Sequence, residues 1–127
     1  MTALFDTSSL LKKYIEESGY NELDELLVSI EQIIVSPTFL LEAYIALERR
    51  FREKNLSNDQ RIFLRNAIKN DMNDFIQVDF NQQLYGVALG LIERYPIATL
   101  DSIQLSSAVI SRPDIFVTSD KKLFVPK

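Results

Sequence analysis

Short apolar runs alternate with longer amphipathic segments along this sequence. The runs are rich in β-branched and aromatic residues, as buried strands are, and they cover 2–5, 32–35, 75–80, 97–100 and 115–117. Between them, apolar residues at i, i+3, i+4 and i+7 indicate helices over 8–17, 23–30, 36–53, 57–74 and 101–110. This alternation predicts an α/β fold with a mainly parallel sheet of four to five strands, covered by helices on both faces.

Capping residues locate several helix boundaries. Ser36 and Pro37 have the residue types of an N-cap and a first helical position. Ser57 and Gln60 match a capping box, and Asn81 is expected to cap a further helix. Helix ends are predicted at Gly19, Tyr95-Pro96 and Arg112-Pro113.

Length and composition limit the possible chemistry. The 127 residues fit one domain, taken here as 1–127. The chain contains no cysteine and no histidine, which removes disulfides, thiolate metal sites, imidazole bases and the commonest zinc ligand. Catalysis would therefore depend on carboxylates, hydroxyls, lysines or a hard metal ion bound by oxygen.

Charge and hydropathy bear on location and partners. The N-terminus lacks a basic region followed by a long apolar run, and no stretch approaches the roughly 20 apolar residues of a membrane span. We therefore expect a cytoplasmic protein without a membrane partner. The net charge of −4 is unlike that of a general nucleic-acid binder, although local basic clusters remain possible.

Four acids fall where strands lead into helices. Asp6 and Asp120 directly follow the first and last strands, whereas Glu42 and Asp101 lie early in helices that follow strands. These strand ends gather along one edge of a parallel sheet, where ligands bind. Asp6 or Asp101 alone is as well explained by a helix cap, and Asp120 alone by a turn. Glu42, within an apolar run, needs a partner if buried.

Four converging carboxylates repel one another unless a cation offsets the repulsion or some are protonated. Oxygen ligands favour Mg²⁺ or Mn²⁺ over Zn²⁺. Such an ion can activate water and stabilise the charge that develops in phosphodiester displacement. Spacing alone permits other phosphate chemistry as well.

Four segments together resemble the PIN domain, in particular VapC-type toxins of bacterial toxin–antitoxin pairs. They read FDTSSL from Phe5, LE at Leu41, LDSIQL from Leu100 and FVTSDKKL from Phe116. The resemblance implies an α/β/α sandwich with strand order 3-2-1-4-5. It further implies endoribonuclease activity with Mg²⁺ or Mn²⁺, a homodimer and an antitoxin partner. Related chains often continue beyond the position of Pro126-Lys127.

By this resemblance, Asp6, Glu42, Asp101 and Asp120 match the family's acidic quartet, and Ser8 and Thr118 match supporting polar positions. The family often has histidine where this chain has Gln104, a position outside the quartet. We expect Asp6, Asp101 and Asp120 to hold metal, directly or through water. Glu42 would hold a second metal or orient the attacking water. Thr118 or Ser119 would hydrogen-bond a carboxylate or a phosphate.

Basic and apolar surfaces allow two interpretations each. Lys12 and Lys121 lie near the acidic edge and are candidates for binding RNA phosphates, with a solvated surface as the equal alternative. The arginine cluster 49–52 is better explained as a solvated helix end favoured by the helix dipole. The helices at 36–53 and 57–74 could clip a partner helix, although core packing explains the same pattern slightly better.

Four other functions are compared with the sequence pattern. A phosphoacceptor receiver domain needs paired acids near its first strand, and a haloacid-dehalogenase-type phosphatase needs Asp-x-Asp there. Asp6 stands alone in Asp6-Thr7-Ser8, so neither fits. A non-catalytic PIN-fold module that binds RNA or protein, and an RNA-processing nuclease outside any toxin–antitoxin pair, both remain open.

Overall fold

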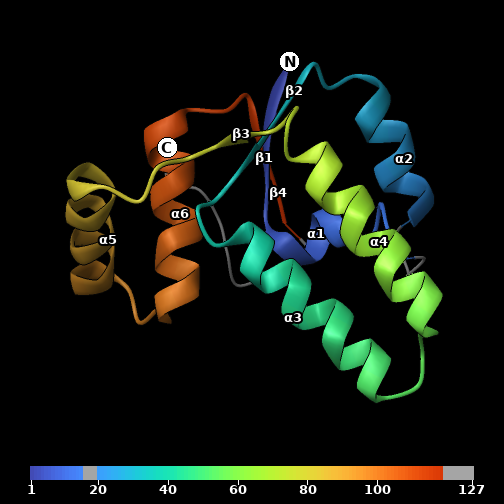
Figure 1. Ribbon diagram of the computed structural model, residues 1–127. Helices are drawn as coiled ribbons and strands as arrows, with labels where there is room; N and C mark the ends of the chain where they lie inside the picture. The colour runs from blue at the N-terminus through green and yellow to red at the C-terminus, as the bar shows by residue number, and fades with distance from the viewer. Residues whose placement is uncertain (16–19, 119–127) are drawn as a thin grey trace.

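The computed structural model describes residues 1–15 and 20–118, and its strands and helices alternate as expected (Figure 1). The strands are β1 (Thr2–Phe5), β2 (Gln32–Val35), β3 (Ile76–Gln77) and β4 (Ile115–Val117). The helices are α1 (Thr7–Leu11), α2 (Tyr20–Val28), α3 (Phe39–Arg52), α4 (Asn58–Asp71), α5 (Gln82–Arg94) and α6 (Thr99–Ser111).

The four strands form a parallel sheet in the order β3-β2-β1-β4. Leu4 is the register partner of Ile34 on one side and of Phe116 on the other, so β1 lies inside the sheet. The predicted α/β class with a parallel sheet is therefore confirmed.

The strand expected at 97–100 is not formed, and this prediction was wrong. The last strand, β4, pairs directly with β1, whereas Thr99 and Leu100 already belong to α6. The chain passes from α5 to α6 through a tight turn in which the Ile97 amide donates to the Tyr95 carbonyl. β3 is also shorter than the predicted 75–80, with two residues in the strand.

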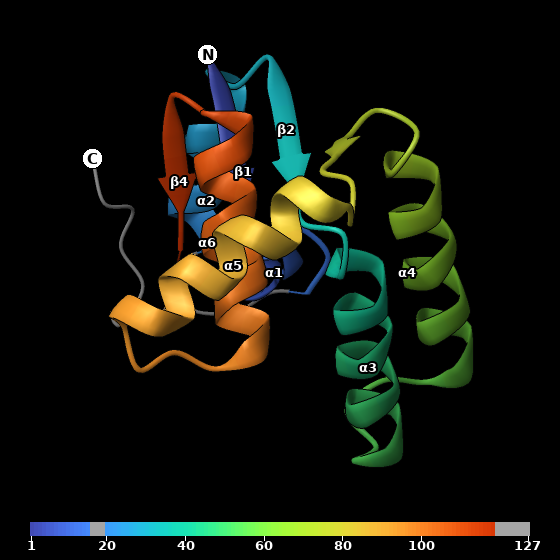
Figure 2. The same ribbon diagram turned by 90° about the vertical axis from the view of Figure 1, so that its left-hand side faces the viewer.

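Successive β1 side chains face two different layers, as the pleat of a strand requires. Ala3 and Phe5 pack in a cluster with residues of α1, α3 and α4, whereas Leu4 packs with Leu84 of α5 and Ile103 of α6. Figures 1 and 2 show α5 and α6 on one face of the sheet and α2 and α4 on the other. β1 is thus held rigidly in the centre, which fixes the position of the residue that follows it.

The helices expected over 36–53 and 8–17 have different bounds in the structure. Ser36 is fully buried and is not the N-cap of α3, because its carbonyl accepts the Phe39 amide and its hydroxyl lies 3.2 Å from that of Thr38. The helix begins at Phe39, after this turn, and Pro37 lies within the turn. The first helix, predicted over 8–17, is five residues long; Gly19, its predicted end, lies outside the described residues. The Ser57 capping box and the Asn81 cap are confirmed.

Polar contacts fix α4 beside α3 and the segment after α1. The Arg61 guanidinium lies 3.8 Å from the centre of the Phe51 ring and donates to Glu48 at 2.9 Å. At the other end of α4, Asp71 accepts hydrogen bonds from Lys13 and Tyr14, each at 2.7 Å.

Over the described ranges, the helices are too short or too polar to cross a membrane.

Candidate active site

Asp6 lies at the point where β1 passes into α1. The Asp6 amide donates to the Val117 carbonyl of the neighbouring strand, and its side chain caps α1 by accepting the Ser9 amide at 2.8 Å. Asp6 is 5% exposed. Asp6 therefore has the capping role that sequence alone allowed, and the cap holds its carboxylate at the edge of the sheet.

Two of the polar residues expected to support the acids contact Asp6. The Thr118 hydroxyl, directly after β4, donates to Oδ2 at 2.5 Å, and the Ser8 hydroxyl donates to Oδ1 at 3.2 Å. Because β4 is the register neighbour of β1, the sheet itself brings Thr118 to Asp6. Both Asp6 oxygens accept hydrogen bonds from neutral groups, and no ion pair links Asp6 to a cation within residues 1–15 and 20–118.

Glu42 lies in the first turn of α3 and is half-buried. One of its oxygens, Oε2, accepts hydrogen bonds from the Thr7 hydroxyl at 2.7 Å and the Thr38 hydroxyl at 3.0 Å. The Gln104 amide of α6 lies 3.4 Å from the same oxygen. Residues of three separate segments therefore orient the Glu42 side chain. They are the hydrogen-bond partners that a glutamate in an apolar run requires.

Asp101 lies in the first turn of α6, where the free backbone amides favour a negative charge. The helix begins here because its first hydrogen bond joins the Ser102 amide to the Ala98 carbonyl. The Asp101 side chain makes no hydrogen bond or ion pair with the described part of the chain.

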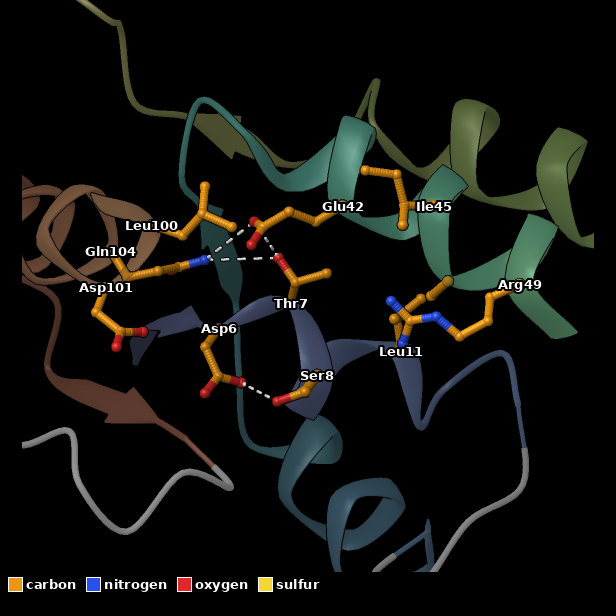
Figure 3. Close-up of a pocket in the computed structure, with 11 residues that line it drawn as sticks. Asp6, Thr7, Ser8, Leu11, Glu42, Ile45, Arg49, Leu100, Asp101 and Gln104 are labelled. Carbon is orange, nitrogen blue, oxygen red and sulfur yellow. Dashed lines mark hydrogen bonds between the residues drawn. The ribbon is translucent and has the colours of Figure 1, made fainter. Parts of the chain in front are cut away.

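Asp6, Glu42 and Asp101 line one pocket of about 330 Å³. In Figure 3 the carboxylates of Asp6 and Asp101 lie on one side of Thr7 and Gln104, and that of Glu42 lies on the other. Among residues 1–15 and 20–118, no three acidic side chains lie close enough to form a metal site by themselves. The pocket thus combines acids from three distant segments, in an arrangement with two acids on one side and one on the other.

The structure does not place several of the predicted site residues in this pocket. Asp120, Ser119 and Lys121 lie outside the described residues. Lys12, the C-cap of α1, does not belong to the residues that line this pocket. Its proposed contact with RNA therefore gains no support from the pocket.

Sequence reasoning missed three residues that the structure brings to this site: Thr7, Thr38 and Arg49. Arg49 lines the pocket from α3, whereas the sequence pattern favours a solvated helix end for the arginine cluster. A signal was available, because Arg49 is seven residues after Glu42 and so falls on the same helix face. Thr38 lies four residues before Glu42, a spacing that also brings two side chains together along a helix. Thr7 had no periodic signal, since it follows Asp6 directly.

Comparison with known proteins agrees with this geometry. The family model of the PIN domain matches residues 3–125, so the chain belongs to the PIN-domain family. A search of curated proteins found no match.

Several solved structures share the fold. A toxin–antitoxin complex from Klebsiella pneumoniae is 17% identical with a TM-score of 0.69, covering 91% of this chain and 84% of that one. VapBC2 from Rickettsia felis, bound to a promoter DNA fragment, is 17% identical with a TM-score of 0.68, covering 96% and 90%. Mycobacterium tuberculosis VapC20, a toxin that cleaves the sarcin–ricin loop, is 14% identical with a TM-score of 0.72, covering 94% and 90%.

Proposed function

We propose that this protein is a metal-dependent endoribonuclease that hydrolyses RNA phosphodiester bonds, and that it is the toxin of a type II toxin–antitoxin pair. The observation that carries the proposal is the convergence of Asp6, Glu42 and Asp101 in one pocket at the edge of a PIN-family sheet. The toxin assignment is supported by the fold shared with toxins of known structure.

The donor set fits a hard divalent cation. The pocket offers carboxylate and hydroxyl oxygens, while cysteine and histidine are absent from the chain, and such ligands favour Mg²⁺ or Mn²⁺. Asp6 and Asp101, with Asp120 as the family resemblance implies, would hold the ion. When bound, it would lower the pKa of a water molecule and offset the charge that develops on the phosphate.

The remaining residues of the pocket have separate roles in this proposal. Glu42, held by Thr7 and Thr38, orients the attacking water or takes part in holding a second ion. Arg49 supplies a positive charge at the same pocket, suited to an RNA phosphate. Thr118 and Ser8 fix the Asp6 carboxylate.

The partners are an RNA substrate, an antitoxin that blocks the site and a second copy of the chain, and the protein would act in the cytoplasm. Support for an antitoxin comes from the toxin–antitoxin complexes that share this fold. If the gene beside this one encodes a small DNA-binding protein, that protein should copurify with this chain and inhibit cleavage.

The decisive experiment measures cleavage of a structured RNA by the purified protein with Mg²⁺, with Mn²⁺ and with EDTA. Asp101→Asn removes a charge from the pocket without breaking a described hydrogen bond, so it should fold normally and cleave poorly. Glu93→Gln, an exposed acid on α5, is the matched control and should retain activity. RNA binding without metal-dependent cleavage would instead identify a non-catalytic PIN-fold module.

A further inference from the structure

Gln104 is an unusual residue within the pocket. It lies on α6, one helical turn after Asp101, and is 4% exposed. Its Nε2 lies 3.4 Å from Glu42 Oε2 and 3.5 Å from the Thr7 hydroxyl oxygen. Its carbonyl oxygen Oε1 is buried and has no hydrogen-bond donor among the described residues. A buried acceptor without a donor destabilises the folded state, so the amide needs an explanation other than stability.

The orientation of this amide follows from charge. If the amide were turned over, Oε1 would face the Glu42 carboxylate, and two acceptors would be placed together. The orientation with Nε2 toward Glu42 gives the carboxylate a donor and leaves Oε1 without one. The site thus satisfies Glu42 and leaves part of Gln104 unsatisfied.

The three donors to Glu42 come from different parts of the fold. Thr7 begins α1, Thr38 precedes α3, and Gln104 belongs to α6. All three contact Oε2, whereas Oε1 of Glu42 accepts no hydrogen bond from the described residues. One oxygen is therefore fixed, and the other is left for a group that enters the pocket.

We infer that Gln104 is a positioning residue: with Thr7 and Thr38 it forms a clamp that fixes Glu42 Oε2 and aligns the free Oε1 for the reaction. This inference rests on the proposed nuclease function. An apolar side chain of similar size would fill the same space without an unsatisfied oxygen, so the clamp gives up some stability for alignment.

The test compares Gln104→Met with Ser107→Ala. Methionine has a similar length and volume but no N–H donor. Ser107 is also a buried polar residue of α6, and its hydroxyl donates to the Ile103 carbonyl of the same helix. For Q104M we expect a fall in kcat of about 10–100-fold, as for other residues that orient a reacting side chain, with KM within about twofold and a melting temperature equal to or above that of the wild type. S107A should keep its wild-type kcat.

Thr38→Val is a second variant, which loosens the clamp from another element and should also lower kcat more than it changes KM. If Q104M cleaves at the wild-type rate, or loses activity only in proportion to a loss of folded protein, the inference is wrong.

A separate measurement keeps this inference distinct from the proposed function. The side-chain amide signals of Gln104 in NMR spectra report its contact with Glu42 whether or not RNA is cleaved. Glu42→Gln should shift these signals, and Glu93→Gln should leave them unchanged. Unshifted signals in E42Q would overturn the clamp, whereas a wild-type protein without nuclease activity would overturn the proposed function.

Discussion

The carboxylate of Asp71 and those of Asp6 and Glu42 are stabilised in different ways. Asp71 accepts the Lys13 ammonium and the Tyr14 hydroxyl, each at 2.7 Å. Asp6 and Glu42 accept only hydroxyl and amide groups, and within the described ranges neither forms an ion pair. Asp71 is thus paired with a cation of the chain itself, whereas the described residues supply no such partner to Asp6 or Glu42, and a bound cation would offset the repulsion between these acids.

The pKa shifts at Asp71 agree with a structural role. Burial opposes ionisation of Asp71, but the hydrogen bonds from Lys13 and Tyr14 outweigh it and lower the pKa of this carboxyl. Burial, followed by the hydrogen bond to Asp71 and its charge, raises the pKa of the Tyr14 hydroxyl well above its usual range. Tyr14 therefore stays neutral and Asp71 stays charged near neutral pH, as a fixed tertiary contact requires.

The largest expected effect comes from Asp6→Asn. Asparagine caps helices about as well as aspartate, so its carbonyl can still accept the Ser9 amide and the fold should survive. Loss of the charge should lower RNA cleavage by more than about 100-fold, the scale seen when one electrostatic group is removed from an active site. Cleavage rates and thermal melts of the same preparation measure both effects. Full metal-dependent activity in the folded variant would exclude Asp6 as a metal ligand.

The sequence predicted correctly those elements whose formation depends on local signals. The β-branched run Gln32–Val35, the Ser57 capping box and the Asn81 cap each depend on neighbouring residues, and each is confirmed. The strand at 97–100 failed because strand formation needs a free place beside another strand, and β4 occupies that place next to β1. The prediction of Ser36 as an N-cap was wrong because Ser36 lies in a turn. In this turn its hydroxyl contacts that of Thr38 and its carbonyl accepts the Phe39 amide.

The site was predictable to a similar degree. Residue type and position near strands selected Asp6 and Glu42, whereas Asp101 was selected as the residue after a strand at 97–100 that is not formed. All three nevertheless line one pocket. The contacts of Glu42 with Thr7 and Gln104 join residues 35 and 62 positions away, and no periodicity in one chain reveals such pairs. Sequence patterns therefore select the charged groups of this site, and only the tertiary structure shows what orients them.

A smaller effect is expected from Asp71→Asn, which tests the other half of the comparison. At pH 7 the variant should lose about 1 kcal/mol of unfolding free energy, the scale of a partly exposed ion pair with one added hydrogen bond, and cleavage should be unchanged. Because the folded state lowers the pKa of Asp71, its contribution is complete above the unfolded pKa of about 3.9 and disappears as the pH falls through the lower folded value. Urea titrations at pH 7 and in acid should show that the unfolding free energies of the wild type and the variant converge as the pH falls.

We expect Asp71 to contribute to stability and the pocket acids to contribute to cleavage. An Asp71→Asn protein that lost nuclease activity at unchanged stability would contradict this expectation. Lys13→Met is the companion variant, because it removes the cation and leaves the Tyr14 contact in place. It should reproduce most of the loss of stability and the same dependence on pH.

The smallest effect concerns Arg49, the positive charge at the edge of an otherwise acidic pocket. Figure 3 shows this side chain reaching from α3 toward Leu11, and within residues 1–15 and 20–118 it forms no ion pair. If Arg49 contacts an RNA phosphate, Arg49→Ala should weaken RNA binding by a few-fold and lower the slope of log K against log salt by about 0.7–0.9. Arg52→Ala, an exposed arginine of the same helix turn outside the pocket, is the control. Equal slopes for both variants would show that Arg49 acts only through the general charge of the helix end.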